Sequence, residues 1–482
     1  MSVTTENQVK KIDLWINGER IAPASKQYFI DHNPEDDSVF AEVADGDESD
    51  VDRAVQSAHL AFQSYRKTLA KEREVYLIKA ASLVEKYEDK FIELLVKEVG
   101  SPIGKARYEV AYAANCLRAA AGVARRISGQ TLPSDSLGRF AMTTRQPIGV
   151  VAAITPFNVP LLKSAKLSSS PLATGNTVVL LPSEQAPMIS NLLADIYHEA
   201  GFPPGTVNVV TGNGAVIGDA LTTHDLVKAV MFTGSSRVGK HIGGLCGSRM
   251  KRALLELGGK SPLVILDDAD LDAAVEAAAM SQFFFQGQAC MASSRIYVDK
   301  KVEQEFLRRF VKKAESLGLG DLYDESTSVG PIISARQRER VRHHIEDARA
   351  KGAKVLTGGE WIGHRCKPTI LSGVNESMVV YREETFGPVT SVYSFSDLDE
   401  AIAQANDSNY GLCSAIFTQD INKAFRFVQE IESGMVHVNA PTILDEPHVP
   451  FGGVKDSGFG REGTDIDVET LTEWKWVTIN LN

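Results

Sequence analysis

The stretch GVVAAITP at residues 149–156 decides the fold, because it is apolar throughout and closes on a proline. Three more runs of this kind follow, each leading into a helical stretch: NTVVLLP (176–182), VNVVTG (207–212) and KAVMFTG (228–234). Strands without polar alternation are covered on both faces, and strands that alternate with helices form a parallel, doubly wound sheet. Ligands bind such sheets at the carboxyl ends of the strands. We therefore expect an α/β fold with its site in the segments that follow these strands.

A second α/β unit is predicted further along the chain. The run PLVILDD (262–268) indicates a buried strand, and Asp270 is placed to cap a helix that runs towards residue 290. The unit continues through a strand at 295–300, a helix at 302–317 and the stretches 379–395 and 414–420. A domain boundary is therefore expected near residues 256–262.

Before the first sheet, the pattern changes from short strands to helices. Residues 13–45 indicate strands and turns, with a hairpin signal at Asn17-Gly18. Helices are predicted over 51–62, 70–98 and 102–127. Two segments, RFAMTTRQ (139–146) and TEWKWVTINL (472–481), have strand patterns that fit neither unit. A terminal apolar strand must be paired, either with another subunit or within its own chain.

The bulk composition argues against several classes of function. A net charge of −11 and a pI near 5.5 disfavour nucleic acid or an anionic membrane surface as the main partner. No run approaches the ~18 apolar residues of a membrane helix, and the polar start MSVTTENQVKK lacks the apolar core of a secretion signal. The cysteines are scattered, without CxxC or Cys/His clusters, so neither a disulfide scaffold nor a metal site is expected. We expect a cytoplasmic protein without a metal ion.

The segment FFFQGQACMASS (283–294) contains the candidate nucleophile, Cys290. A thiol attacks only as thiolate, and at the ordinary pKa of ~8.5 only a few per cent is ionised at neutral pH. If Cys290 is catalytic, the chain must supply a base, a group that stabilises an oxyanion and an acceptor for whatever leaves. The alternative is a buried structural thiol, since unpaired cysteines are among the most buried residues.

Five stretches together resemble signatures of the aldehyde dehydrogenase superfamily, and the resemblance covers nearly the whole chain. They are TPFNVP (155–160), LELGGKSP (255–262), GQAC (287–290), EETFGPV (383–389) and PFGGVKDSGFGRE (450–462). The spacing also matches, with 98 positions from Asn158 to Glu256 and 34 from Glu256 to Cys290. One such match is weak, whereas five in the right order are specific.

The resemblance implies a fold of three parts. These are a Rossmann-like, parallel-sheet NAD-binding domain (1–124 and 148–257), an α/β catalytic domain (258–464) and a small β oligomerisation element (125–147 and 465–482). It also implies a homodimer or homotetramer that is joined through the C-terminal strand.

The resemblance and the chemistry of aldehyde oxidation assign the same three catalytic residues. Attack by Cys290 gives a thiohemiacetal, whose oxyanion the Asn158 amide and the backbone N–H of Cys290 hold; losing such a donor typically costs ~10²–10³-fold in rate. Collapse expels a hydride, which only a redox cofactor accepts, and Glu256 activates the water that hydrolyses the thioester. Outside this context, Asn158 would be a turn residue and Glu256 a solvated or paired carboxylate.

The resemblance implies NAD or NADP as cofactor, although GNGAVIG (212–218) lacks the GxGxxG spacing of the common fingerprint. In FTGSSRVG (232–239), the free N–H groups at the start of a helix can meet the pyrophosphate. The residues implied to contact the cofactor are Ile154, Thr155, Pro156, Phe157, Ser183, Glu184, Gly234, Ser235, Gly239, Leu257, Glu384 and Phe386. Of these, Glu384 and Phe386 correspond to the residues that hold the nicotinamide ribose and ring.

One departure from the family bears on the choice of cofactor. Where the family usually has a lysine at the adenine-side ribose, this chain has Leu181, while Glu184 is kept. A carboxylate that accepts from both ribose hydroxyls repels the additional phosphate of NADP. Both features favour NAD, and NADP is the alternative.

The candidate walls of the substrate pocket are mostly large and apolar. They are Phe157, Val159, Leu162, Lys163, Phe284, Met291 and the loop 440–451, which ends at Phe451. Such walls suit a flat or apolar aldehyde, and simple core packing is the alternative. The loop NAPTILDEPHVPFGG and the pair Cys290-Met291 resemble the vanillin, salicylaldehyde and benzaldehyde dehydrogenase branch. We expect Lys163 and His448 to contact a phenolic or acidic tail, and only Arg295 lies close enough in sequence to bind a second carboxylate, as succinate semialdehyde requires.

Three alternatives to an aromatic aldehyde dehydrogenase remain. The first is an aliphatic aldehyde or semialdehyde dehydrogenase with the same mechanism. The second is an acylating enzyme that passes the acyl group to coenzyme A; such members generally lack the glutamate, so Glu256 favours hydrolysis. The third is a non-enzymatic protein on this scaffold, which loss of the nucleophile or the glutamate would mark, and both residues are present.

Overall fold

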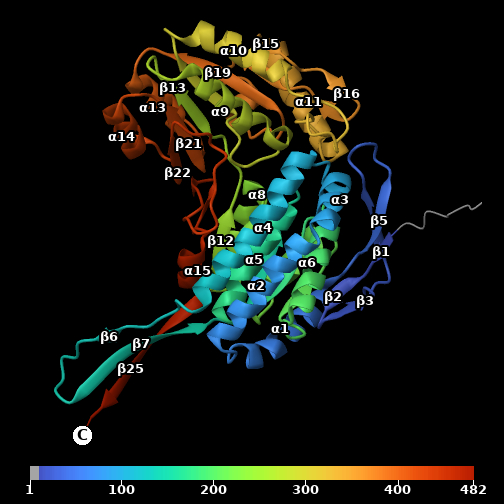
Figure 1. The fold of residues 1–482 in the computed structure, drawn as a ribbon, viewed down its shortest axis with the longest axis vertical. Coiled ribbons are helices and arrows are strands. Elements are labelled where there is room, and N and C mark those ends of the chain that lie inside the picture. Colours follow the sequence, from blue (N-terminus) through green and yellow to red (C-terminus); the bar gives the residue numbers. More distant parts are fainter. Residues whose placement is uncertain (1–9, 482) are drawn as a thin grey trace, which may run out of the picture.

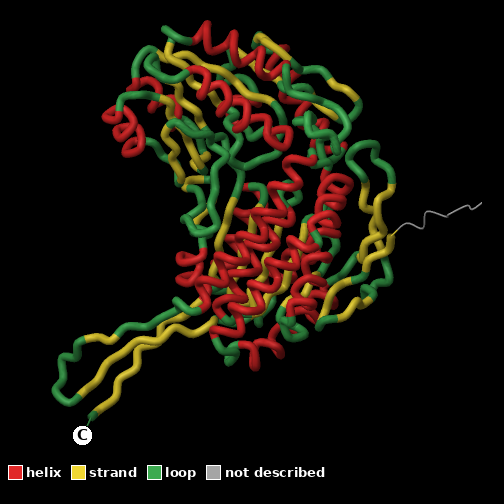
Figure 2. The backbone as a smooth tube through the Cα atoms, viewed as in Figure 1, coloured by secondary structure: helices red, strands yellow, loops and turns green. Residues whose placement is uncertain are grey.

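Two sheet-centred lobes and a protruding arm make up the computed structural model, which describes residues 10–481. In Figure 1 the first lobe lies below the second, and the arm extends to the lower left with the C-terminus at its tip. Figure 2 shows that helices flank the strands of both lobes, whereas the arm contains only strands and loops.

An eight-stranded sheet organises the first lobe, and its central strands are parallel, as the apolar runs predict. Its order is β24 (Gly458–Phe459), β12 (Arg252–Glu256), β11 (Val227–Thr233), β8 (Val150–Thr155), β9 (Thr177–Pro182), β10 (Val207–Val209), β2 (Leu14–Ile16) and β3 (Glu19–Ile21). Asn17 and Gly18 form the predicted hairpin turn between β2 and β3. Ile154 of β8 pairs with Leu181 of β9 and Phe232 of β11, so the carboxyl ends of the central strands meet at one edge.

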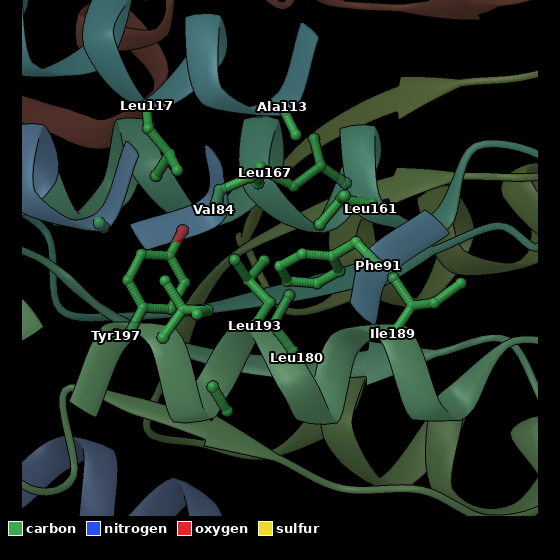
Figure 3. Close-up of a cluster of buried hydrophobic side chains, with 14 of the residues drawn as sticks. Val84, Phe91, Ala113, Leu117, Leu161, Leu167, Leu180, Ile189, Leu193 and Tyr197 are labelled. Carbon is green, nitrogen blue, oxygen red and sulfur yellow. The ribbon is translucent and has the colours of Figure 1, made fainter. Parts of the chain in front are cut away.

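Helices cover both faces of this sheet. One face packs against α2 (Ala70–Lys86), α3 (Glu88–Val99), α4 (Ile103–Ala124), α5 (Pro160–Thr174) and α6 (Pro187–Ala200). The other packs against α1 (Glu48–Tyr65), α7 (Gly214–Thr223) and α8 (Ser236–Ser248). Figure 3 shows how side chains of several helices, including Phe91, Leu161 and Leu193, meet Leu180 of β9 in the first of these cores.

The helix predicted over 70–98 is two helices, because the backbone leaves the helical region at Tyr87 (φ −101°, ψ 21°). The break turns the apolar side chains on both sides of it, such as Val84 and Phe91, into the same core.

A seven-stranded sheet organises the second lobe and is parallel except at β15. Its order is β15 (Lys354–Thr357), β18 (Thr369–Ser372), β19 (Val389–Phe395), β14 (Arg295–Asp299), β13 (Pro262–Ile265), β21 (Cys413–Phe417) and β22 (Met435–Val438). Its helices are α9 (Leu271–Phe283), α10 (Glu303–Glu315), α11 (Ala335–Ala350), α12 (Val379–Arg382), α13 (Leu398–Asn406) and α14 (Ile421–Glu430). The predicted stretch 379–395 is a strand only from Val389; it begins as α12, where Asp347 accepts a hydrogen bond from the N–H of Val379 (2.8 Å).

The arm is a three-stranded sheet of β6 (Thr131–Leu132), β7 (Arg139–Pro147) and β25 (Thr472–Asn480), which α15 (Thr464–Leu471) joins to the first lobe. Strands β7 and β25 pair antiparallel over nine residues, so the C-terminal strand docks within its own chain. The side chains of Trp476 and Ile479 remain 69% and 47% exposed. Within residues 10–481, the outer edge of β25 has no neighbouring strand.

The remaining strands form one three-stranded sheet and two two-stranded sheets. They are β1 (Lys10–Ile12), β5 (Val39–Ala44) and β4 (Tyr28–His32) in one sheet, β16 (Trp361–Ile362) with β17 (Arg365–Cys366), and β20 (Tyr410–Gly411) with β23 (Val454–Lys455). Among the helices of residues 10–481, none combines the length and the apolar character needed to cross a membrane.

Candidate active site

The candidate nucleophile lies in a turn that the second lobe presents to the first. After α9 and a short 3₁₀ helix (Phe284–Gly287), the backbone takes positive φ at Phe285 (47°), Gln286 (45°) and Gly287 (70°). Such conformations cost ~1–3 kcal/mol at non-glycine residues and persist only when the surroundings fix them. The buried Gln286 amide supplies this restraint by donating to the Pro331 carbonyl (2.8 Å) and accepting from the Gly330 N–H (3.1 Å). Cys290 follows and is half-buried.

Two adjacent glycines let the end of β12 approach this turn. A Cβ at Gly259 would lie 2.3 Å from the carbonyl oxygen of Cys290, and a Cβ at Gly258 would lie 2.4 Å from Glu384 Oε2. Real Cβ atoms do not approach other atoms this closely, so a larger residue would push the turn or Glu384 away. The glycines of the LELGG motif therefore act through close backbone approach.

Glu256 ends β12 with its side chain 2% exposed. Neither carboxylate oxygen has a hydrogen-bond partner among the described residues. Its position is fixed through the backbone, where its carbonyl accepts from the N–H of Gly234 (3.0 Å). Burial, and then the nearby carboxylate of Glu462, hold the pKa of Glu256 well above its usual value. Glu256 can therefore hold or accept a proton close to neutral pH.

The thiol of Cys290 does not ionise readily by itself. Burial raises the pKa of Cys290 to about 12; the Lys163 ammonium opposes this rise, and the carboxylates of Glu384, Glu256 and Glu462 add to it. Cys290 therefore needs a base to become a nucleophile near neutral pH, and Glu256 is the buried carboxylate without a partner.

Asn158 lies directly beyond β8 and is 6% exposed. Its Nδ2 donates to the carbonyl of Gln288 (2.9 Å), two residues before the nucleophile. An amide nitrogen carries two N–H groups. One fixes the turn, and the other is available for an oxyanion formed at Cys290.

A cluster of buried charges lies behind these residues. We call it the α5 charge cluster: Lys163 and Lys166 of α5, Asp445 of the loop 440–451 and Glu462. Lys163 Nζ lies 2.6 Å from Glu462 Oε2, and Lys166 Nζ lies 2.9 Å from Asp445 Oδ2. Although burial alone would raise it, the two ammonium groups lower the pKa of Glu462.

The residues assigned to the pyrophosphate lie at the start of α8. The Ser235 hydroxyl caps the helix by accepting from the N–H of Val238 (3.4 Å). A Cβ at Gly239 would lie 2.2 Å from Leu257 Cδ2, and one at Gly234 would lie 2.4 Å from the ring of Phe232. Small residues thus keep the backbone of this turn close to its neighbours, with free N–H groups at a helix N-terminus.

The residues assigned to the two riboses carry carboxylates at separate places. Exposed Glu184, beyond β9, accepts through Oε1 from the N–H of Gly214 (2.6 Å), next to half-buried Ser183. Leu181 is 3% exposed within the core of the first lobe, so its side chain belongs to packing. Glu384 accepts through Oε1 from the N–H of Gly259 (3.0 Å), and burial raises the pKa of Glu384 to about 7.

The segment Ile154–Phe157 leads from the end of β8 to Asn158. Thr155 is buried, while Ile154, Pro156 and Phe157 are half-buried. Phe157 meets Phe386 edge to face, with the ring centroids 5.7 Å apart. Two residues assigned to the cofactor, one from the TPFNVP signature and one from EETFGPV, are therefore in contact.

The predicted pocket walls also meet, and α4 adds two residues that the sequence reading missed. Phe284 packs edge to face on Tyr108 (5.8 Å between centroids), which lies 5.7 Å from Tyr112. Tyr112 packs with Leu162 and Val159. Tyrosines four positions apart share one face of a helix, and that spacing was the available signal. Phe451 lies beneath Lys163 and Lys166, whose Nζ atoms are 4.7 and 4.8 Å from its ring centroid.

The structure places the three charged residues that the sequence linked to the tail of a substrate. Arg295 is buried and donates to the carbonyls of Lys260 (2.8 Å) and Ala405 (2.9 Å), so it holds the backbone of the second lobe. The side chain of His448 is 64% exposed and points to Glu446 (3.6 Å). Lys163 Nζ is paired with the carboxylate of Glu462 (2.6 Å).

The half-exposed Met291 ties the substrate loop to the nucleophile. Its carbonyl accepts from the Thr442 hydroxyl (2.7 Å), which fixes the loop 440–451 beside Cys290. Within residues 10–481, no group of His, Cys, Asp and Glu side chains is arranged to hold a metal ion.

Relatives of known activity extend over almost the whole chain. The sequence matches the family described as "Aldehyde dehydrogenase family" over residues 21–477. It is 40% identical over 471 residues to a vanillin dehydrogenase of Pseudomonas fluorescens, covering 97% of this chain and 98% of that protein. It is 38% identical over 475 residues to a glutarate-semialdehyde dehydrogenase of Pseudomonas putida, covering 98% of this chain and 99% of that protein.

Solved structures share the fold in full. A salicylaldehyde dehydrogenase from Pseudomonas putida G7, complexed with salicylaldehyde, matches with a TM-score of 0.95 at 40% identity and covers 98% of both chains. A betaine aldehyde dehydrogenase from Staphylococcus aureus in complex with NAD+ matches with a TM-score of 0.95 at 32% identity, covering 98% of this chain and 95% of that one.

Proposed function

The chain belongs to the aldehyde dehydrogenase family, and from that premise we propose that it oxidises an aromatic aldehyde to the carboxylic acid with NAD in the cytoplasm. One observation carries the catalytic part of the proposal. The buried, unpartnered Glu256 carboxylate lies three residues before Gly259, which approaches the backbone of Cys290 closely. We assign Cys290 as nucleophile, Glu256 as general base and Asn158 as oxyanion donor.

The reaction begins with the thiol proton. The Glu256 carboxylate accepts it, which a raised pKa makes effective near neutral pH. Cys290 Sγ then bonds to the aldehyde carbon, and the carbonyl oxygen becomes an oxyanion held by Asn158. A bound nicotinamide supplies the acceptor for the hydride that leaves this thiohemiacetal. The product is a thioester on Cys290.

Hydrolysis of the thioester completes the cycle. Glu256 first releases the thiol proton to solvent and is again a carboxylate. It then takes a proton from water, whose oxygen attacks the acyl carbon, and the C–S bond breaks to release the carboxylic acid and the Cys290 thiolate. Acylating relatives that use coenzyme A instead of water generally lack this glutamate, so the presence of Glu256 supports hydrolysis.

The fit of the chain to a dinucleotide supports NAD. The N-terminus of α8 presents free N–H groups and small residues for a pyrophosphate. Glu184 and Glu384 would accept hydrogen bonds from the two riboses. Because Leu181 is buried in the core and offers no cation, the exposed Glu184 carboxylate disfavours the additional phosphate of NADP.

The aromatic part of the proposal is supported by the pocket walls and by relatives that act on vanillin and salicylaldehyde. Phe157, Phe284 and Tyr108 supply flat apolar surface near Cys290. The second candidate is a semialdehyde, because a glutarate-semialdehyde dehydrogenase is also a close relative. The burial of Arg295 disfavours it, since that arginine cannot bind a second carboxylate.

Initial rates of NADH formation test this proposal. Benzaldehyde, vanillin and salicylaldehyde would be compared with hexanal and succinate semialdehyde, each with NAD and with NADP. We expect the aromatic set to exceed the others in kcat/KM by at least about tenfold, which corresponds to about 1.4 kcal/mol of transition-state discrimination. Equal or faster turnover of the aliphatic aldehydes would reject the aromatic assignment while leaving the mechanism in place.

A further inference from the structure

Two polar oxygens beside the predicted pocket are buried without partners. They are Oδ1 of Asp445, whose side chain is 9% exposed, and the hydroxyl of Tyr112, a residue 7% exposed. Among the described residues, neither has a partner in good hydrogen-bond geometry, and the Tyr112 hydroxyl faces the carboxylate of Asp445. Buried polar groups are nearly always paired, so such a pair of orphans calls for a ligand. One is an acceptor, and the other both donates and accepts.

The two oxygens lie close to each other. Burial, and next the charge of Asp445, raise the pKa of Tyr112, so its hydroxyl stays protonated beside that carboxylate. The other carboxylate oxygen of Asp445 lies 2.9 Å from Lys166 Nζ. Although burial opposes it, Asp445 and Glu462 raise the pKa of Lys166, and this lysine therefore keeps its charge.

The orphan pair also lies near the nucleophile. Asp445 comes three residues after Thr442, whose hydroxyl donates to the carbonyl of Met291 (2.7 Å), next to Cys290. Tyr112 packs against Leu162 and Val159, just beyond Asn158. Both residues therefore belong to segments that adjoin Cys290 and Asn158.

The charges around the pair decide which group it accepts. The α5 charge cluster contains two ammonium groups and two carboxylates, which contact one another, so no cation is left for an incoming carboxylate. The free oxygen of Asp445 would repel an anion. It would accept a hydrogen bond from a neutral hydroxyl, and Tyr112 would donate one to the same hydroxyl.

We propose that Tyr112 and Asp445 form a subsite for a hydroxyl group on the ring of an aromatic aldehyde. The ring hydroxyl donates to Asp445 Oδ1 and accepts from the Tyr112 hydroxyl, while the aldehyde carbon faces Cys290. This inference rests on the proposed function and narrows its substrate class to hydroxylated aromatic aldehydes.

The test compares the ortho, meta and para hydroxybenzaldehydes with the tolualdehydes, in which a methyl group replaces the hydroxyl. Assays would be run at a pH that keeps the phenol protonated. For the matching isomer, the wild type should prefer the hydroxyl over the methyl compound by at least about tenfold in kcat/KM, because a site built for a hydroxyl rejects its apolar analogue.

The decisive variant is Tyr112→Phe. It should remove most of this preference, mainly by raising KM for the hydroxyl compound, and change kcat/KM for the methyl compound far less, because a methyl group forms no hydrogen bond with the tyrosine. Tyr108→Phe is the matched control, because Tyr108 offers the same ring from the same helix with 43% exposure. Asp445→Leu, which removes the acceptor while Lys166 Nζ keeps its contact with Glu462 Oε2 (3.5 Å), is the second variant, and it should lose the preference as well.

The possible results distinguish failure of the hydroxyl subsite from failure of the proposed function. Turnover of benzaldehyde without a preference for any hydroxyl isomer would overturn the subsite alone, as would equal losses in Tyr112→Phe and Tyr108→Phe. Faster turnover of formylbenzoates than of hydroxybenzaldehydes would show that the site takes a carboxylate and would also overturn it. Failure to oxidise any aromatic aldehyde would overturn the proposed function itself.

Discussion

At the scale of single residues, one feature of the site is that its nucleophile and its base both resist ionisation. Burial raises the pKa of Cys290 to about 12 and that of Glu256 well above its usual value. The charge that most opposes the rise at both residues is the Lys163 ammonium. Reactivity at neutral pH therefore depends on a lysine that is paired with Glu462.

We predict that kcat/KM rises with pH as Glu256 loses its proton, because only its carboxylate accepts the thiol proton. Lys163→Met removes the charge that lowers the pKa of Cys290 and Glu256, so the rise should move to higher pH by about one unit. The measurement is a pH profile of kcat/KM for both proteins. Lys97→Met, at an exposed ion pair with Glu93, is the control and should leave the profile unchanged. A superimposable profile for Lys163→Met would contradict the role given to its charge.

Glu256→Gln should separate acylation from hydrolysis. The amide cannot take a proton from water, so steady-state turnover should fall by about 10²–10⁴-fold. At alkaline pH, where some thiolate forms without Glu256, one rapid turnover of NADH should still precede the slow phase in stopped-flow absorbance. Cys290→Ala should show no rapid phase and retain binding of NAD. An undiminished steady-state rate would remove Glu256 from the mechanism.

At the scale of elements, the site depends on how closely the end of β12 approaches the turn after α9. We predict that Gly259→Ala lowers kcat by about 10²-fold, because the added Cβ would move the backbone of Cys290, and a misplacement near 1 Å costs about that much. The clash would be between the new Cβ and the backbone carbonyl of Cys290, so no side-chain rotamer change can relieve it. The thermal midpoint should change far less than the rate.

The control for this variant is Gly244→Ala in α8, where an added Cβ meets nothing within 4 Å. It should leave kcat unchanged. Wild-type activity in Gly259→Ala would show that the turn of Cys290 tolerates displacement.

The elements also show what a sequence can predict. The parallel strands were predictable because short, uninterrupted apolar runs that alternate with helices are typical of strands buried on both faces of a parallel sheet. Cys290, Glu256 and Asn158 were recognised because each stands in a local signature. The break at Tyr87 was missed, since the apolar pattern continues across it.

Contacts between distant segments were beyond the sequence. Nothing in the local pattern joins Tyr112 of α4 to Asp445 of the substrate loop, and nothing shows that Lys163 is already paired with Glu462. The burial of Arg295 likewise follows from carbonyls that other segments supply. The contacts that shape the substrate pocket were therefore not predictable from the local sequence.

At the scale of the whole molecule, the arm of β6, β7 and β25 leaves apolar side chains exposed on a free strand edge. Long exposed edges pair with other chains. We therefore infer a homodimer or homotetramer assembled through this arm, in line with the similarity of the chain to its family.

We predict that Trp476→Glu, at a side chain 69% exposed in β25, lowers the molar mass in light scattering from an oligomer to smaller species. A charge there must be desolvated in an interface, which costs several kcal/mol. Phe425→Glu, at a residue 61% exposed in α14, is the control and should not change the mass. A wild-type protein that scatters as a monomer would refute assembly through the arm.

The arm has a further consequence for how the protein responds to dilution. Strand β25 follows directly from α15, which packs on α4 and α5 beside the site. If the arm is covered only in the assembly, the free energy of association adds to the free energy of unfolding of each subunit. Mass action then makes the thermal midpoint depend on protein concentration. A dilute sample would unfold at a lower temperature than a concentrated one, and its active fraction would fall with the same dependence.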